Sequence, residues 1–570
     1  APCCAQSGAG RCGEFEVGQE ERKNWVLIYN HLGMVKVFSI IATVFSIIAN
    51  IWLIVSIVVF IAERRFKILD VFKHWLGKPV SFSYKNDDFA RDTIKYRFRN
   101  IIYDINNEYE NAMVKLRPNI IERIVKDNGE IVDNSVKLDN AREDWKKRVL
   151  NRPLHADSFY GGIFQKPDLF RLLPDGIISE KNVNAGKRLL SSFYKKYLAE
   201  YKENKDFIER APFIDVEHVF YFYILDKLGS LTDDVKKEMC DNTLIEPSEN
   251  QIIDNTLGVF DPYKFKKRKS IEDDINIGIL AEPNKKKSSR ILLGLKAINN
   301  INNGGFNTVD VLQEILEGSL DSNSYDLSQL KGMEWNETKA DDEDKKGIQG
   351  VISFLLNPSD KTTRSVNYLV DNAGVEFFID LILGYCLLKD SNLRIDRIIY
   401  HVNVLPIFVS DVIENDKDYT FKVISETIEK SKTIIDNHKQ EYRNAIESLK
   451  KMFDNNEAEI SSSFIWNMPT PYEDVVSQEK EGSFFTGHDL LIVKGDLNYR
   501  RLCRDMTWHY LKRLEKLTKY ITCPTLVIRS FKSNLIVDYD RTKYYAHSKE
   551  DADWKTNGTY GVIAFMKKQG

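Results

Sequence analysis

The chain has 570 residues, of which 43% are hydrophobic and 29% charged, an ordinary globular composition that is long enough for several domains. Its formal net charge of −3 argues against a general nucleic-acid binder. The seven cysteines lack the paired C-x₂-C spacing of a zinc site and indicate no disulfide framework.

The first predicted elements are a leader over residues 1–36 and a transmembrane helix over residues 37–62. The second segment contains no charged residue and is long enough to cross a hydrocarbon core of about 30 Å. A buried soluble helix is the alternative, but a helix of this length normally has a polar face. Basic residues are denser after the segment than before it, which favours a cytosolic location for the rest of the chain. We therefore expect a single-pass membrane protein, in a membrane that the sequence does not identify.

The next region, residues 80–330, shows apolar residues mainly at helical spacing, as in 187–198 and 218–228. This pattern predicts a mainly helical subdomain. Two charged tracts predict solvated loops, the first being 264–269 followed by 285–287 and the second 341–346. Contact of the basic tract with anionic lipid is the alternative.

Residues 331–570 change to a strand and helix pattern. The run 366–370 is short, apolar and β-branched, as in a buried strand, and helical spacing begins after Gly374. Asp371 and Asn372 lie in the turn between them and offer two hard oxygens suited to Mg²⁺ or Mn²⁺. The alternative is an ordinary turn closed by Asx hydrogen bonds.

Two later segments repeat this pattern. Residues 398–404 predict a strand, after which Pro406 is expected to open a helix that carries Asp411. Residues 490–493 predict another strand, which runs into Gly495. In a parallel sheet these strand ends meet in one crevice.

The last predicted strand of this set covers residues 526–532. Alternation along it places Ser530 and Lys532 on one side and Arg529 on the other, where a structural ion pair is at least as good an interpretation as a functional role. His401, inside an apolar strand, is interpreted as a core residue with a hydrogen-bond partner.

Four ordered motifs, residues 371–376, 408–411, 494–500 and 529–532, together resemble the damage-control phosphatases. They are most similar to subfamily III, the sugar phosphate phosphatases also described as acidic-residue protein O-methyltransferases. With this resemblance we expect an α/β fold: a three-layer αβα Rossmann-like core over 331–570, a helical subdomain before it, and a single transmembrane helix at the start.

The resemblance also implies roles for individual residues. It assigns Asp371, Asn372 and Asp411 as ligands of a divalent metal ion, Mn²⁺, Mg²⁺, Co²⁺ or Ni²⁺. The expected substrate-binding residues are Asp371, Asn372, Glu376, Lys494, Gly495, Asp496, Leu497, Asn498 and Lys532. The expected catalytic residues are Asp371, Asp496 and Glu376. The attacking group stays open: either a water positioned by Glu376 or Asp496, or a carboxylate that forms a phospho-enzyme.

Three functions are compatible with these observations. The first is a membrane-anchored, metal-dependent phosphatase acting on small sugar phosphates such as fructose phosphates. The second is a protein carboxyl O-methyltransferase that uses S-adenosylmethionine, ranked lower because no glycine-rich methyltransferase loop is visible. The third is a catalytically idle, membrane-anchored interaction module, which the absence of the family's Trp-Gly before residues 326–328 keeps open. The sequence indicates no particular protein partner.

Overall fold

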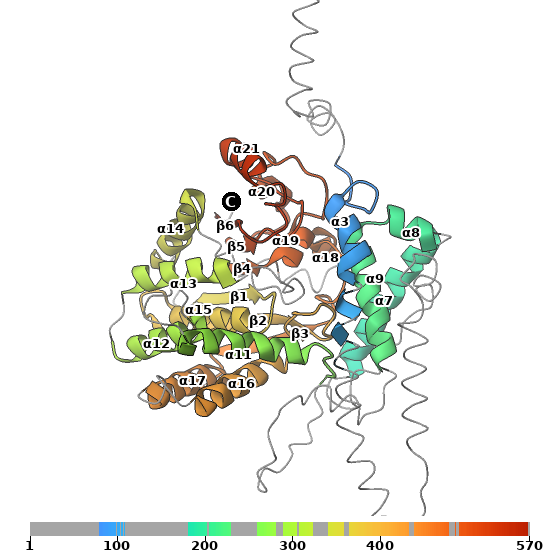
Figure 1. Cartoon of the computed structure of the whole chain (residues 1–570). Helices are drawn as coiled ribbons and strands as arrows, with labels where there is room; N and C mark the ends of the chain where they lie inside the picture. The colour runs from blue at the N-terminus through green and yellow to red at the C-terminus, as the bar shows by residue number, and fades with distance from the viewer. Residues whose placement is uncertain are drawn as a thin grey trace, which may run out of the picture. The chain divides into compact units, whose positions relative to one another are not determined.

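One mixed sheet organises the described part of the chain (Figure 1). Its strands are β1 (Arg364–Leu369), β2 (Ile395–Asn403), β3 (Ala458–Ser463), β4 (Leu490–Lys494), β5 (Thr525–Ser530) and β6 (Gly561–Met566). The strand order is β3-β2-β1-β4-β5-β6, and all neighbours are parallel except β5 and β6. This is the strand order of a doubly wound sheet. The chain adds strands outward on one side of β1 and then, from β4, on its other side, which leaves a crevice at the carboxyl ends of β1 and β4.

The computed structural model describes residues 79–98, 100–102, 104–105, 108, 180–201, 204–229, 259–280, 289–304, 307–322, 340–357, 364–431, 438–477, 485 and 489–567. Residues 79–570 form one compact unit. The predicted leader and the predicted membrane span 37–62 lie outside the described residues. No helix within the described ranges is both long and apolar enough to cross a bilayer.

Helices cover both faces of the sheet. They are α3 (Asp88–Asp92), the π-helix η1 (Thr93–Arg97), α7 (Glu180–Glu200), α8 (Asn204–Arg210), α9 (Phe213–Gly229), α11 (Lys264–Leu280), α12 (Arg290–Asn302), α13 (Thr308–Ser322), α14 (Asp342–Leu356), α15 (Val375–Lys389), α16 (Asp416–Lys430), α17 (Lys439–Asp454), α18 (Tyr472–Ser477), α19 (Asp496–Leu502), α20 (Leu514–Leu517) and α21 (Arg541–Glu550).

Alternation along the strands divides the core between the two faces. Tyr368 and Ile492 pack with the helices from α11 to α17 in one cluster. Leu369 and Val493, each one residue further along its strand, pack with α18, α19 and α20 in another. The predicted α/β fold is therefore confirmed. The helices α11, α12 and α13 share the first cluster with α15, so these helices pack directly on the sheet core.

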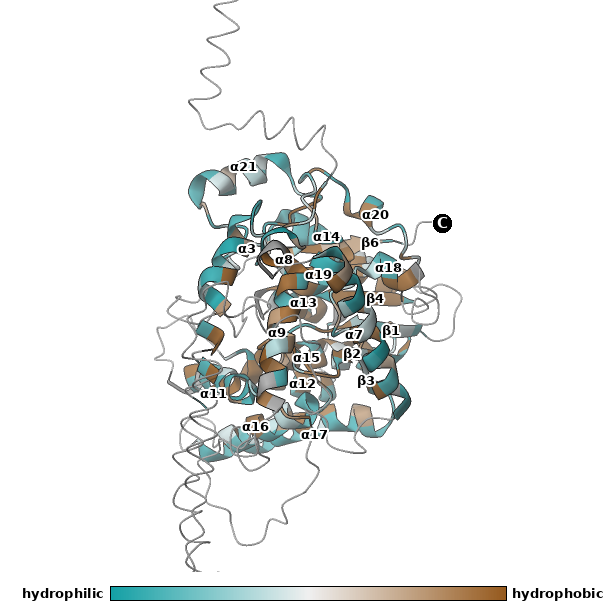
Figure 2. Ribbon diagram, turned by 90° about the vertical axis from the view of Figure 1, so that its right-hand side faces the viewer, coloured by the Kyte–Doolittle hydropathy of each residue, from teal (hydrophilic) through white to brown (hydrophobic). Residues whose placement is uncertain are grey.

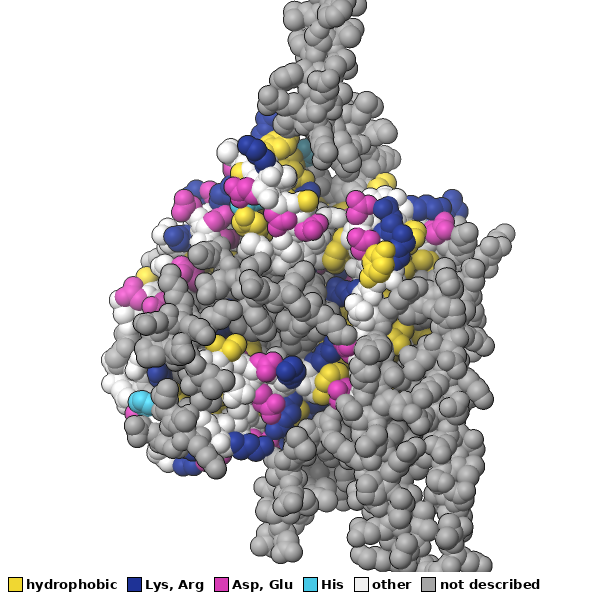
Figure 3. Space-filling model, in the orientation of Figure 1, with side chains coloured by type: hydrophobic (Ala, Val, Ile, Leu, Met, Phe, Trp, Pro, Cys, Tyr) yellow, Lys and Arg dark blue, Asp and Glu magenta, His cyan; other side chains and the backbone are white. Residues whose placement is uncertain are grey.

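The amino-terminal helices reach the sheet through the segment that follows β2. Val404, Ile407 and Val409 pack with α7 and α9 in a third cluster rich in aromatic side chains. Figure 2 shows that α9 is largely hydrophobic, whereas α21, which has no buried residue, is hydrophilic along its length. On the face drawn in Figure 3, acidic and basic side chains of the described residues intermingle, in keeping with the small net charge.

Both predicted solvated loops are wrong where the structure describes them, and residues 285–287 lie outside the described ranges. Residues 264–269 form the first turns of α11, and Lys267 is only 1% exposed because buried carboxylates neutralise it. Residues 342–346 begin α14, where Asp341 and Asp344 form a reciprocal capping box. Composition alone misjudged both tracts, since charged residues satisfied by caps or ion pairs are compatible with a packed helix.

The helix predicted to begin at Pro406 is also wrong. Residues 404–415 contain no helix, and α16 begins only at Asp416. The backbone N–H groups of Val404 and Leu405 donate to Asn467 Oδ1, at 3.0 and 3.2 Å. The Asn467 side chain, from the loop after β3, thus supplies the hydrogen-bond acceptor that a helix would otherwise provide. Asp411 therefore lies in an irregular segment and not on a helix.

Candidate active site

The carboxyl ends of β1 and β2 are joined directly at the predicted metal ligands. Asn372 and Asp411 form an isolated antiparallel backbone bridge. Ala373 N donates to Ser410 O at 2.6 Å, and Val412 N donates to Asp371 O at 3.3 Å. The two segments that carry Asp371, Asn372 and Asp411 are therefore held side by side by main-chain hydrogen bonds.

Gly495 lets the end of β4 approach this pair. Its φ is 90°, and a Cβ atom built on it would lie 1.9 Å from the carboxyl carbon of Asp371. Any side chain at this position would displace Asp371. The glycine predicted to sit in the turn after β4 is thus required by close packing as well as by backbone conformation.

The amide of Asn372 has a defined orientation. Its Nδ2 donates to Asp371 Oδ2 and to Glu376 Oε2, both at 2.8 Å. Glu376 is fully buried, and an ionised carboxylate only accepts hydrogen bonds, so the nitrogen must face it. The oxygen Oδ1 then accepts, at 2.5 Å, from the Oγ of Ser410, the residue before Asp411.

Lys494 lies behind this arrangement, where it is fully buried. Its ammonium contacts Asp380 Oδ1 at 2.6 Å and Glu376 Oε1 at 3.3 Å, and Tyr368 OH donates to the same Asp380 oxygen at 2.7 Å. Burial raises the pKa of Asp380 to about 6, although Lys494 opposes the shift. Burial alone would lower the pKa of Lys494, but the two carboxylates outweigh it and raise that pKa.

Asp496 begins α19 and organises the end of β5. Its Oδ1 accepts from Arg529 Nε at 2.7 Å and from Lys532 N at 3.3 Å. Arg529 is fully buried, so its interpretation as a structural ion pair is confirmed. Asn498 links the ends of β1 and β4, since its Nδ2 donates to Val370 O at 2.9 Å and to Lys494 O at 2.8 Å.

A pocket of about 500 Å³, including the space at its open mouth, brings most of the predicted residues together. It is lined by Phe89, Arg97, Glu217, Tyr221, Asp371, Asn372, Phe408, Val409, Ser410, Asp411, Asp496, Leu497, Arg500 and Lys532. Glu376 and Lys494 are not on its wall but behind it. The sequence reasoning gave no site role to Arg97, Glu217 or Tyr221, which lie on helices far from the four motifs in the chain. A family-like segment around Arg97 and an aromatic run around Tyr221 were the available signals.

The cations in this pocket differ in their partners. Arg500 donates to Asp505 through Nε and Nη2, both at 2.9 Å, and to Glu217 through Nη1 at 2.6 Å. Lys532 is 4% exposed, and its ammonium makes no ion pair with any residue that the structure describes. Lys532 lines the same pocket as Asp371, Asp411 and Asp496, where its ammonium is available to an anion that binds there.

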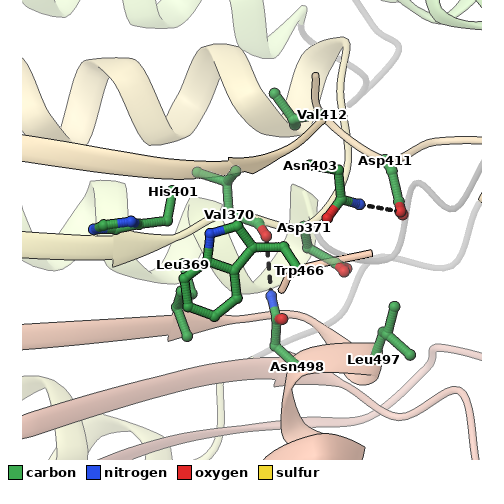
Figure 4. A pocket seen from close by; sticks show the side chains of 10 residues that line it. All are labelled: Leu369, Val370, Asp371, His401, Asn403, Asp411, Val412, Trp466, Leu497 and Asn498. Atoms are coloured by element: carbon green, nitrogen blue, oxygen red, sulfur yellow. Dashed lines mark hydrogen bonds between the residues drawn. The ribbon is translucent and has the colours of Figure 1, made fainter. Parts of the chain in front are cut away.

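A second pocket borders the first and is drawn in Figure 4. It shares Asp371, Asp411 and Leu497 with the first pocket and adds a wall of His401, Asn403, Trp466 and Asn498. His401 Nε2 lies 2.8 Å from Asn367 Oδ1, so the predicted hydrogen-bond partner is present. His401 is half-buried on the pocket wall, however, and not in the core as predicted. Asn403, at the end of β2, donates to Asp411 Oδ2. Its position at a strand end is a signal that the sequence reasoning did not use.

The donor set of Asp371, Asn372 and Asp411 fits a hard divalent cation. Two carboxylates and one amide oxygen come from segments bridged at the backbone, and Glu376 fixes which end of the amide is presented. Within the described ranges, no group of three or more His, Cys, Asp or Glu side chains is arranged to hold a metal. A metal here would therefore depend on the asparagine and keep positions open for water or substrate.

Comparison with known proteins gives one consistent result. A family model described as "Damage-control phosphatase ARMT1-like domain" matches residues 177–546. Damage-control phosphatase ARMT1 of Danio rerio is 30% identical over 202 residues, which cover 35% of this chain and 42% of that protein. The Mus musculus protein of the same name is 27% identical over 273 residues, covering 45% of this chain and 59% of its own length. The chain thus spans about half the length of these curated relatives.

Proposed function

Because the chain belongs to the damage-control phosphatase ARMT1-like domain family, we propose that it hydrolyses small phosphomonoesters with a divalent metal ion held by Asp371, Asn372 and Asp411. The observation that carries the proposal is Lys532, a buried cation on the pocket wall that has no ion-pair partner in the described structure. A phosphate dianion bound in the pocket would pair with this ammonium.

The chain's own residues divide the work as follows. The metal, when bound, supplies positive charge that neutralises phosphoryl oxygens. Lys532 binds the same phosphate from the end of β5, and Asp496 orients Lys532 by accepting its backbone N–H. Of the two carboxylates expected to position the attacking water, Asp496 lines the pocket, whereas Glu376 holds Asn372. Asp496 is therefore the better candidate for contact with the nucleophile, and Glu376 acts through Asn372.

For the substrate we propose sugar phosphates such as fructose phosphates, as in subfamily III. The pocket offers Phe89, Tyr221 and Phe408 beside the charged groups, so a compact carbon skeleton can lie against aromatic rings. We also propose that residues 37–62 anchor the protein in a membrane, with the phosphatase on the cytosolic side.

The full chain extracted from membranes with detergent provides the test. We expect phosphate release from sugar phosphates with Mn²⁺, Mg²⁺, Co²⁺ or Ni²⁺, and none with EDTA. Lys532→Met should raise KM by roughly 10-fold or more, because a charge-assisted contact with phosphate is lost. Lys543→Met, which breaks an ion pair with Asp341, is the control and should leave KM unchanged.

Two outcomes would contradict these proposals separately. Absence of turnover from folded protein with every metal would exclude the phosphatase for the substrates tested. Recovery of the full chain in the soluble fraction, before any detergent is added, would exclude the membrane anchor without affecting the phosphatase.

The Gly495→Ala variant should lose most of its activity. Its added Cβ would occupy the place of the Asp371 carboxyl, and a displacement of about 1 Å at a catalytic group can cost on the order of 100-fold in rate. The backbone strain should also cost about 1–3 kcal/mol in the free energy of unfolding.

Gly304→Ala is the matched control for this variant. Gly304 has a φ of 75°, and no atom lies within 4 Å of a Cβ built on it. We expect a comparable loss of stability in urea and unchanged turnover. Equal turnover of the two variants would show that the approach of Gly495 to Asp371 is unimportant for activity.

A further inference from the structure

The ammonium of Lys267, on α11, is buried directly beneath the Asp411 segment. The Lys267 side chain is 1% exposed, and its Nζ lies 2.7 Å from Asp261 Oδ2 and 2.7 Å from Asp416 Oδ2. The same Nζ donates to the main-chain oxygen of Asp411 at 2.7 Å. The ammonium therefore donates hydrogen bonds to Asp416 Oδ2 and to the backbone of Asp411, a proposed metal ligand, and forms an ion pair with Asp261.

These contacts hold the Asp411 segment from the side opposite to Asn372. On one side Asp411 is bridged to Asn372, and on the other its carbonyl is held by Lys267. Asp416 Oδ2, which pairs with Lys267, also accepts from Ile413 N at 2.9 Å. The Lys267 ammonium thus holds the irregular segment after β2 at two places. It contacts the segment directly at Asp411, and it contacts Asp416, whose carboxylate holds Ile413.

The same turn of α11 also supports the other half of the site. Ser270 Oγ donates to Lys267 O at 2.8 Å and lies 2.3 Å from the place that a Cβ of Gly374 would take. Gly374 closes the turn that carries Asp371 and Asn372. One helix therefore touches both segments that supply the proposed metal ligands, and Lys267 is its buried charged contact with the Asp411 segment.

We propose that Lys267 is a positioning residue of the metal site, which sets the place of Asp411 by holding its carbonyl. This inference rests on the proposed function, because it requires Asp411 to be a metal ligand. A lysine buried only for stability would gain little over an apolar side chain of similar volume, since the desolvation of the three charges offsets much of their attraction. A role in positioning Asp411 explains why a charged side chain is buried at this place.

The test is Mn²⁺ binding by the full chain in detergent. Binding is measured by calorimetry and by the electron paramagnetic resonance signal of free Mn²⁺. Lys267→Met should weaken Mn²⁺ binding by about 10- to 100-fold, the size of effect seen when support behind a metal ligand is removed. Lys266→Met is the matched control on the same helix, because Lys266 pairs with Asp104 at 2.8 Å instead. It should bind Mn²⁺ within about twofold of the parent.

Thermal unfolding without metal is recorded in parallel, because a merely structural role would lower the unfolding temperature and leave the affinity of the folded protein unchanged. If Lys267→Met does not fold, Lys267→Met/Asp416→Asn replaces it, since this pair of changes keeps the net charge of the cluster. Folded variant protein that binds Mn²⁺ as tightly as the parent, or an equal loss in Lys266→Met, would overturn the inference. A parent that binds no Mn²⁺ would instead overturn the proposed metal site, and this inference with it.

Discussion

Replacing Asp371 with asparagine is expected to lower kcat/KM by at least about 100- to 1000-fold. Asp371 lies two residues after the end of β1, accepts from the Asn372 amide, and lines both pockets. The substitution keeps the shape of the side chain and removes one of the two carboxylates proposed to hold the metal. The half-buried position of Asp371 should make the effect on stability small.

The measurement is phosphate release over a range of Mn²⁺ concentrations, compared with Asp88→Asn. The Asp88 side chain is 87% exposed, and among the described residues it pairs only with Arg91, so its replacement should leave turnover unchanged. If excess Mn²⁺ partly restores Asp371→Asn, the loss lies in metal binding. Turnover of Asp371→Asn within tenfold of the parent would remove Asp371 from the catalytic machinery.

Replacing Lys494 with methionine should destabilise the protein by roughly 3–5 kcal/mol, because Asp380 and Glu376 would be left buried without their cation. The sequence reasoning expected Lys494 to contact the substrate, and that role stays a prediction. A loss of stability without a change in KM of the folded fraction would indicate a structural role. A raised KM at unchanged stability would instead support contact with the substrate.

The pH dependence of this variant follows from Asp380. Its pKa is about 6 in the folded protein against 3.8 as the ordinary value, so the folded state binds the proton more tightly. Any contribution of Asp380 to stability is therefore full below about pH 4 and is lost as the pH rises through 6. Because a protonated Asp380 needs no counterion, the deficit of Lys494→Met should be smaller at pH 5 than at pH 8.

Urea unfolding at both pH values measures these effects, with Lys389→Met as the control. Lys389 pairs with Glu457 at the surface, where the two side chains are 31% and 33% exposed. Loss of this pair should lower the free energy of unfolding by less than about 1 kcal/mol. If Lys494→Met unfolds at the same urea concentration as Lys389→Met, Lys494 is not needed to stabilise the buried Asp380 and Glu376 carboxylates.

The sequence by itself determined the junctions where strands end in turns. The strands β1, β4 and β5 and the start of α15 were predictable because hydrophobic periodicity and glycine conformation act over a few residues. The resemblance of four sequence motifs to the damage-control phosphatases pointed to Asp371, Asn372, Asp411, Asp496 and Lys532, which the structure brings to one pocket. Parallel pairing then makes their convergence a general consequence of the topology.

Only the tertiary structure decided which charged side chains face the pocket and which face the core. Lys494 turns inward to Asp380, 114 residues away in the chain, and Lys267 reaches the Asp411 carbonyl over 144 residues. Glu217 meets Arg500 over 283 residues. A buried charge is tolerated only where its partners converge on it in space, and no local pattern of residues encodes that convergence.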